Sequence, residues 1–398
     1  MLLMTARGFS ASGVGALIAL VALVTLVLEL PTGGLADVAG RRVVLVAASS
    51  IMALGFMCAG TSSRHSVIVF GLVLFAVGRA LSSGPLVSWY VDEVNAIVPA
   101  DRRDDAITHG LSRSTTALSI ALAVGSVSGG WLSALGVSLG LPARGDAPVI
   151  GLSVPFLLAA ALMAADVLAL VRWMHEPPRS RSSMSELAAS VPATVRSGIV
   201  LVSGQPLLRW FFLRWAIVPV GFLAFELLSP IRLGKLLADP ADAAGIFGVV
   251  TALAYGGQSV SASAANWLAR RVGRVRASAG LTMSTGVAFA AAGAGRIGGL
   301  VAAVLIAMVV SGPVNALNGP IVHGAVGPEH RTTLLSIESL TTQIAVAAGA
   351  IVLGATARAT GTGAAFAVAG SITALGALPM VGVAFAQRSA TRTLRQPA

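Results

Sequence analysis

Long apolar runs separated by short polar segments are the dominant pattern along the 398-residue sequence. A helix needs about 20 consecutive apolar residues to cross a bilayer, and eleven runs come close to that length or exceed it. We expect membrane-spanning helices near residues 13–33, 43–61, 67–94, 108–138, 149–172, 209–231, 241–265, 277–295, 298–326, 334–357 and 362–386. The pattern therefore predicts an all-α polytopic membrane protein.

The longest polar stretch, residues 174–206, divides the predicted spans into five before it and six after it. Within it, Ser183 and Glu186 have the spacing of a capping box, which predicts a short surface helix that Pro192 would interrupt. We expect an N-terminal helical bundle, a cytoplasmic linker, a C-terminal bundle and a cytoplasmic tail over residues 1–173, 174–208, 209–387 and 388–398.

The composition supports a membrane protein and argues against an enzyme. Hydrophobic residues make up 56% of the chain and charged residues 11%, whereas soluble domains carry about 25% charged residues. The single cysteine, Cys58, excludes a disulfide framework and a cysteine-based metal site. The five histidines are scattered, and no nucleophile–base set is present. We expect no enzymatic activity, no bound metal and no cofactor.

The positive charges predict an orientation in the membrane. The net charge is +11, but the basic residues fall in short loops between apolar runs, which argues against a nucleic-acid partner. Because cytoplasmic loops carry an excess of Lys and Arg, we expect the N-terminus outside and the C-terminus inside. Seventeen arginines then lie inside: Arg41, Arg42, Arg102, Arg103, Arg172, Arg179, Arg181, Arg196, Arg209, Arg270, Arg271, Arg274, Arg276, Arg331, Arg388, Arg392 and Arg395. Seven basic residues lie outside: Arg7, Arg64, Arg144, Arg232, Lys235, Arg296 and Arg358.

Two loops of the first half recur in the second half. The segment Gly34-Leu-Ala-Asp-Val-Ala-Gly-Arg41 is echoed by Trp267-Leu-Ala-Arg-Arg-Val-Gly-Arg274. The pair Pro99 and Arg102 likewise recurs, at nearly the same offset, as Pro328 and Arg331. Two similar halves in direct order are typical of a transporter built from parallel repeats.

On these residues the chain resembles the major facilitator superfamily. The run Gly33-Gly-Leu-Ala-Asp-Val-Ala-Gly-Arg-Arg42, with Glu29-Leu-Pro-Thr before it, is similar to that family's signature loop between its second and third helices. The resemblance covers nearly the whole chain. It implies two six-helix bundles around a central cavity, alternating access and no covalent chemistry.

The chain departs from the family in two respects. The family has twelve helices, and sliding the second half back until Arg274 falls on Arg41 places its opening span before Met1. We therefore expect the first helix to be missing, either because the true start lies upstream or because the carrier is specialised. The family's antiporter signature, a GPxxGG pattern, stands here as Gly125-Ser-Val-Ser-Gly129-Gly130 without its proline. We interpret these glycines as helix-packing positions, with a role in antiport as the alternative.

The resemblance implies a conformational latch at the cytoplasmic ends of the first-half helices. Asp37, Arg41 and Asp92 would hold the outward-open state, because an arginine can bind a carboxylate with two hydrogen bonds. Glu29 lies one turn before the signature glycine and either joins the latch or bonds to nearby backbone. The alternative is that all of these are solvated interfacial charges.

Polar residues inside the predicted spans are candidates for binding the substrate or a proton. Arg79 and Glu226 lie in spans that line the cavity in the family, and a charge there is costly, at about 2.5–3.5 kcal/mol on insertion scales. Asn315 and Asn318 lie beside Pro313 and Pro320, where a broken helix would free carbonyl groups for a ligand. Helix-to-helix bonding is the competing interpretation for these residues, and we favour it for Asp166.

Together the sequence predicts a monomeric secondary transporter of a small solute in the bacterial inner membrane. We expect protons to drive it, and the partial glycine signature slightly favours export. The alternatives are an uptake carrier or uniporter for a sugar, an amino acid or a metabolite, and a degenerate membrane protein that transports nothing.

Overall fold

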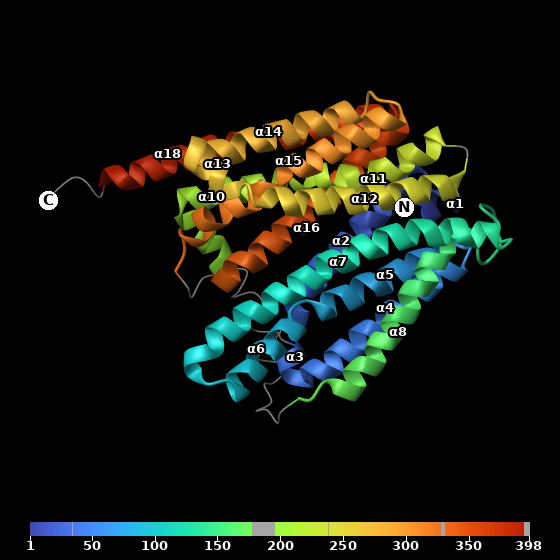
Figure 1. Ribbon diagram of the computed structural model, residues 1–398, viewed down its shortest axis with the longest axis horizontal. Coiled ribbons are helices and arrows are strands. Elements are labelled where there is room, and N and C mark those ends of the chain that lie inside the picture. The colour runs from blue at the N-terminus through green and yellow to red at the C-terminus, as the bar shows by residue number, and fades with distance from the viewer. Residues whose placement is uncertain (34, 177–195, 238, 328–330, 394–398) are drawn as a thin grey trace. The chain divides into compact units, whose positions relative to one another are not determined.

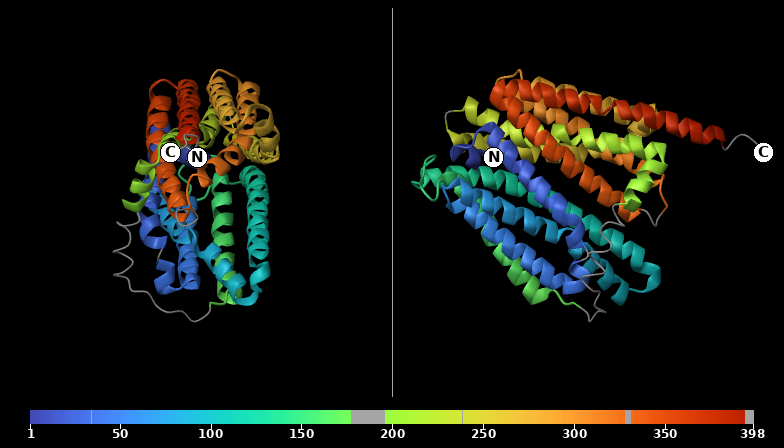
Figure 2. Two further views of the ribbon diagram at one scale, coloured as in Figure 1. Left: turned by 90° about the vertical axis from the view of Figure 1, so that its left-hand side faces the viewer. Right: turned by 180° about the vertical axis from the view of Figure 1, so that it is seen from behind.

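The computed structural model describes residues 1–33, 35–176, 196–237, 239–327 and 331–393 of the chain. The predicted capping box of Ser183 and Glu186 lies outside these residues, as do Arg179, Arg181 and Arg395. The side chains of Asp37, Arg331 and Arg392 are also outside the description. Every regular element among the described residues is helical, and Figure 2 shows this from two further sides.

The helices of the first part of the chain begin with a short one at the N-terminus and end before residue 174. They are α1 (Leu2–Ala6), α2 (Ala11–Gly33), α3 (Leu35–Ala39), α4 (Arg41–Thr61), α5 (His65–Ser82), α6 (Pro85–Ile97), η1 (Ala100–Arg102), α7 (Arg103–Ser138), η2 (Gly151–Ser153) and α8 (Val154–Trp173). Helix α4 packs between α5 and α8 (Figure 1).

The helices of the second part follow a similar plan. They are α10 (Pro206–Ile217), α11 (Pro219–Leu236), α12 (Pro240–Ala262), α13 (Ala265–Val272), α14 (Arg274–Ala292), α15 (Ile297–His323), α16 (Arg331–Ala359), α17 (Thr362–Leu375) and α18 (Leu378–Thr393). Helix α14 packs against both α15 and α17 (Figure 1). A buried apolar cluster joins α10, α15, α16 and α18 through Leu208, Phe211, Ile321, Val322, Leu334, Met380 and Val383.

Ten segments among the described residues are long and apolar enough to cross a membrane, and they match ten of the eleven predicted spans. The eleventh, predicted over 277–295, is formed by α14, which has 19 residues. Its hydropathy is lowered by Arg274, Arg276 and several serines and threonines. Hydrogen bonds satisfy part of this polarity, since Ser278 donates to Asn318 of α15 and Thr282 accepts from Arg214 of α10.

Three predicted spans consist of two α-helices each: 67–94 of α5 and α6, 209–231 of α10 and α11, and 362–386 of α17 and α18. The 67–94 span is divided into α5 and α6 at Gly84, whose φ of 95° is a conformation that favours glycine. Pro85 follows at the first position of α6, where its missing N–H costs nothing.

In contrast, α15 continues through Pro313 and Pro320, so the predicted broken helix is wrong. Neighbouring groups can satisfy the backbone that a proline frees inside a membrane bundle.

The chain divides into two compact units that interleave in sequence. One contains Met1–Ala19, Ala193–Ala238 and Val250–Ala398, and the other contains Leu20–Pro192 and Asp239–Val249. Helices α2 and α12 therefore each contribute residues to both units. These two helices occupy corresponding places in the two sequence repeats.

Candidate functional site

The signature loop forms a tight turn between α3 and α4. Gly40 adopts a φ of 96°, which an L side chain rarely takes, and it precedes the first residue of α4. Ala36 on α3 packs into a buried cluster with Val44 and Ala48 of α4 and Leu81 of α5. This packing fixes the start of α4 and thereby the position of Arg41.

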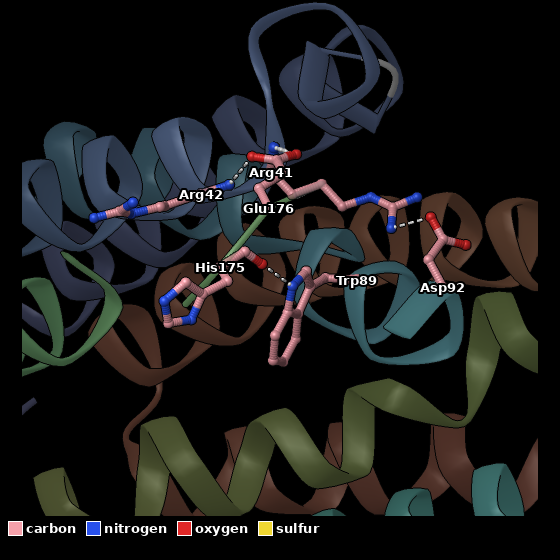
Figure 3. A network of polar contacts seen from close by, with 6 residues as sticks. All are labelled: Arg41, Arg42, Trp89, Asp92, His175 and Glu176. Atoms are coloured by element: carbon pink, nitrogen blue, oxygen red, sulfur yellow. Dashed lines mark hydrogen bonds and ion pairs between the residues drawn. The ribbon is translucent and has the colours of Figure 1, made fainter. Parts of the chain in front are cut away.

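Arg41 forms an ion pair with Asp92 of α6 across this turn (Figure 3). Its Nη1 atom donates to Asp92 Oδ2 over 2.6 Å, a short distance typical of a charge-assisted bond. The Arg41 side chain is only 9% exposed, whereas that of Asp92 is 49% exposed. The structure thus brings together two of the four residues predicted to form the latch, although they lie on different helices.

Glu176, which the sequence did not single out, joins the same site (Figure 3). Its two carboxylate oxygens accept the backbone N–H groups of Arg41 at 2.7 Å and Arg42 at 3.1 Å. These N–H groups have no partner inside α4 because they belong to its first turn. The carboxylate therefore satisfies two N–H donors, and its negative charge interacts favourably with the positive end of the helix dipole. The only sequence signal for Glu176 is its place just after a span, before two prolines.

Two further hydrogen bonds hold the last turn of α8 and the segment after it against this site. Trp89 on α6 donates its Nε1–H to the His175 carbonyl oxygen over 2.8 Å, and the Arg42 guanidinium donates to the Val171 carbonyl oxygen. The network of Arg41, Arg42, Trp89, Asp92 and Glu176 is called the loop network below. It connects α4, α6 and the end of α8 (Figure 3).

The remaining latch candidates stay predictions. The side chain of Asp37 lies outside the described part of the structure. Glu29 lies near the end of α2 and is partly buried. One turn beyond it, the single hydroxyl proton of Thr32 is shared between the Leu28 carbonyl oxygen of its own helix at 2.7 Å and the Ala80 carbonyl oxygen of α5 at 3.1 Å, so α2 and α5 lie in contact at this end. Arg79, the residue before Ala80 on α5, has an exposed side chain.

A second group of polar side chains lies on α11, α12 and α15. The Tyr255 hydroxyl of α12 donates to Glu226 Oε1 of α11 over 2.9 Å. One turn along α12, Gln258 Nε2 lies 2.9 Å from Ser311 Oγ of α15, in position to donate to it. Asn315 follows Ser311 by one turn of the same helix and is exposed, as is Glu226. Glu226, Tyr255, Gln258, Ser311 and Asn315 are called the polar strip below.

The aromatic rings beside the polar strip are packed rather than free. Phe225 is fully buried, and its ring contacts the Tyr255 ring edge-on at a centroid distance of 6.1 Å. This contact restricts the Tyr255 side chain and aims its hydroxyl at Glu226. Glu226 and Asn315 were candidates from the sequence, whereas Tyr255 and Gln258 were not. The sequence does contain one signal for Tyr255 and Gln258, because polar residues three positions apart lie on the same face of a helix.

Several other intramembrane polar residues pair with neighbouring helices. Asn318 is buried and accepts a hydrogen bond from Ser278 of α14 through Oδ1 at 2.8 Å. Asp166 of α8 accepts one from Ser49 of α4 at 2.6 Å, which is the structural pairing that the sequence favoured. Arg214 is 2% exposed and donates to the Gly376 carbonyl and to Thr282 Oγ1. These contacts explain why polar residues are tolerated at those positions.

The glycines of the partial antiporter signature differ in their surroundings. A methyl group added at Gly130 of α7 would lie 2.5 Å from the Ala244 carbonyl oxygen of α12, closer than real contacts allow. At Gly129 the nearest atom, on Pro155, would be 4.0 Å away, and at Gly125 no heavy atom of the described residues lies within 4 Å. Close packing therefore accounts for Gly130 and not for Gly125.

The Gly130 contact belongs to a helix crossing that occurs twice. Gly248 of α12 packs against the Ser126 carbonyl of α7, and Gly15 of α2 packs in the same way against the Ala350 carbonyl of α16. The facing helix also contributes a glycine to each crossing, Gly130 of α7 opposite Gly248 and Gly354 of α16 opposite Gly15. Gly15 and Gly248 are related by the same offset as the two copies of the repeated loop. The sequence repeat is therefore also a repeat of helix packing.

Two solved structures resemble this arrangement over the whole chain. No family model and no curated protein sequence matches the chain. The crystal structure of the nucleoside transporter NupG matches with a TM-score of 0.67 and 14% identity, covering 96% of this chain and 92% of that one. A bacterial homologue of the human lysosomal transporter Spinster, in an inward-facing and occupied conformation, matches with a TM-score of 0.68 and 17% identity. That match covers 100% of this chain and 94% of the other.

The chain has the major facilitator fold. It is a multi-pass membrane protein, as the apolar runs predicted. The predicted all-α fold class and the resemblance carried by the signature loop are both confirmed. Within this fold, the loop network lies at the signature loop itself, and the polar strip lies on spans of the second half.

Proposed function

We propose that this chain is a secondary active transporter that moves a small solute by alternating access. One observation carries the proposal: Glu226, a carboxylate within a membrane-spanning segment, is exposed and receives a hydrogen bond from Tyr255. A charge facing lipid is costly, and intramembrane carboxylates therefore face a bundle interior or a water-filled cavity. We infer that Glu226 faces the transport path.

The polar strip supports this assignment. Glu226 and Asn315 are exposed, Tyr255 and Gln258 are half-buried, and these four side chains offer both hydrogen-bond donors and acceptors. Ser311 is buried and orients Gln258, while its own hydroxyl donates to the Met308 carbonyl oxygen. Such a strip suits a polar solute, a proton or both. We propose protons as the coupling ion, with Glu226, which Tyr255 orients, as the proton-binding residue. Arg79 remains a second candidate for solute binding, on α5.

The loop network supports a change between two conformations. An ion pair joins Arg41 to Asp92, and Glu176 connects the same turn to the end of α8. We propose that this network is the latch of the outward-open state, with Asp37 and Glu29 as further members. We also propose that residues 1–173 and 209–387 form the two moving bundles, with 174–208 as their linker.

Flux measurements in proteoliposomes test the proposal. Radiolabelled solutes, including nucleosides because one fold neighbour is a nucleoside transporter, are offered with and without an imposed pH gradient. We expect Glu226→Gln to abolish gradient-driven flux while solute exchange without a gradient is kept. The matched control is Asp146→Asn, which removes an exposed loop carboxylate and should leave the flux unchanged. Full gradient-driven flux in the Glu226→Gln variant would contradict proton coupling at this residue.

The direction of transport is a separate part of the proposal. We propose export from a bacterial inner membrane by a monomer, on the strength of the glycine signature at Gly125 and Gly129. Solute accumulation in inside-out vesicles would support export, and accumulation in right-side-out vesicles would favour an uptake carrier or uniporter instead. A chain that binds but never moves any solute of the panel would support the non-transporting alternative.

A further inference from the structure

The junction of α13 and α14 carries a concentrated positive charge at the end of a membrane span. Arg270 and Arg271 close α13, and Arg274 and Arg276 open α14. All four side chains are exposed, and they are called the arginine surface below. The preceding span ends at Ala262, shortly before α13 begins. The arginine surface therefore lies where the chain leaves the apolar part of the bilayer.

No carboxylate among the described residues neutralises this charge. Between Asp242 and Glu338 the sequence contains a single acidic residue, Glu329, which lies outside the described residues. None of the four guanidinium groups forms an ion pair with a carboxylate that the structure describes. Even a full pairing with Glu329 would leave three positive charges. The arginine surface can therefore bind an anion from outside the chain.

The first half of the molecule shows what such an anion would do. Gly40 and Gly273 are repeat-related, adopt φ angles of 96° and 85°, and precede α4 and α14 respectively. At α4 the Glu176 carboxylate accepts the free N–H groups of the first turn. At α14 the N-cap residue is Gly273, which has no side chain to cap the first turn, and the sequence after Glu338 contains neither Asp nor Glu. Among the described residues, no carboxylate fills at α14 the position that Glu176 fills at α4.

Apolar surface beside the arginines indicates that the anion belongs to a membrane lipid and not to a soluble molecule. Trp267 is 53% exposed and Val272 is 48% exposed on the same short helix. The Arg271 guanidinium lies over the Trp267 ring, 5.6 Å from its centroid, so the charge and the aromatic ring are held together. Tryptophan is enriched at the level of lipid headgroups, and basic clusters next to a span attract anionic lipids. A soluble anion would leave Trp267 and Val272 in water.

We propose that the arginine surface binds the phosphate headgroup of an anionic membrane lipid. The arginines donate to the phosphate oxygens, for which a guanidinium has the matching planar geometry. The first-turn N–H groups of α14 face the same anion, and Trp267 and Val272 contact the upper part of the acyl chains. The site thereby attaches the α13–α14 corner of the second half to the membrane surface.

Lipid selectivity measured on the full-length chain tests this proposal. The protein is reconstituted in phosphatidylcholine nanodiscs that contain spin-labelled phosphatidylglycerol or spin-labelled phosphatidylcholine. The fraction of immobilised label gives the preference for the anionic lipid. We expect a clear preference in the wild type, lost at least about threefold in R270Q/R271Q/R274Q/R276Q, and weakened by salt at about 0.5 M because surface charges are screened there.

The control variant removes four exposed arginines elsewhere, three in loops and Arg358 in the last turn of α16, as R64Q/R144Q/R296Q/R358Q. It should keep the wild-type preference. An unchanged preference in the four-glutamine variant would overturn the proposal. Displacement of the labelled lipid by millimolar glycerol phosphate would show a site for soluble phosphate and would also overturn it. If the four-glutamine variant does not fold, Trp267→Ala decides, since an unaltered preference there contradicts the lipid site.

Discussion

Glu176 joins the segment after α8 to the start of α4 through two backbone N–H groups, so its loss has a defined cost. Its carboxylate accepts from Arg41 N and Arg42 N at the start of α4. Removing a capping side chain from a helix start costs about 1 kcal/mol. We expect Glu176→Ala to lower the free energy of unfolding by about that amount, and Glu176→Gln by less, because an amide oxygen still accepts one bond. Thermal unfolding in detergent measures this, with Asp146→Ala as the control that should not change.

The ion pair of Arg41 and Asp92 predicts how the effects of two substitutions combine, and not only how each affects stability. If the two side chains act only through each other, Arg41→Gln and Asp92→Asn should each shift the equilibrium between inward- and outward-open states. The double variant should then shift it no further. We expect a coupling energy of about 1 kcal/mol, because Asp92 is half exposed and exposed pairs are weak.

Spin-label distances across the two bundles measure the populations of these states. A variant of Arg113, an exposed arginine of α7 without a described ion pair, provides the matched control. Strictly additive shifts in the double variant would show that Arg41 and Asp92 act independently, and the latch proposal would then lose its support.

The two glycine crossings depend on close contact between pairs of helices. Gly248 of α12 packs against the backbone of α7, whereas Gly245 on the same helix has no heavy atom of the described residues near its missing side chain. We expect Gly248→Ala to destabilise the protein by about 1–3 kcal/mol, since the added methyl group meets a backbone carbonyl that cannot rotate away. Gly245→Ala should be neutral or slightly stabilising, because alanine favours the helix.

Gly15 tests whether the crossing is a property of the repeat. Its environment on α16 matches that of Gly248 on α7, so Gly15→Ala should cost about as much as Gly248→Ala. Thermal unfolding in detergent compares the three variants. Equal stabilities of Gly245→Ala and Gly248→Ala would contradict the packing argument.

Helices could be predicted well from this sequence because lipid leaves few alternatives. A spanning segment must satisfy its backbone internally, so an apolar run of sufficient length indicates a helix. The details at Gly84 and Pro313 could not be predicted in the same way. Glycine followed by proline divided one span, whereas Pro313 and Pro320 left α15 continuous. Whether proline breaks a helix depends on its neighbours in space, which the local sequence does not contain.

Residues of the candidate site could be predicted only where the resemblance to the family's signature loop pointed to them. Arg41 and Asp92 were proposed as partners from the family resemblance, and the structure brings them together. Glu176 lies far along the chain from Arg41, and Tyr255 lies on the helix after the one that carries Glu226. Neither pairing follows from spacing along one helix, because the partners lie on different elements. Only the packing of α4 against α8 and of α11 near α12 makes them neighbours.

The distribution of arginines predicts how the whole chain lies in the membrane. With the N-terminus outside, seventeen basic residues fall in cytoplasmic segments and seven in outer ones, and such a bias determines orientation. The loop network and the arginine surface then share the cytoplasmic side, where anionic lipids attract basic segments. We expect reporter fusions at Arg181 and Arg395 to report the cytoplasm and a fusion at Arg144 to report the periplasm in a bacterial host. A periplasmic signal from the fusion at Arg181 would reverse the orientation and place the arginine surface on the outer leaflet.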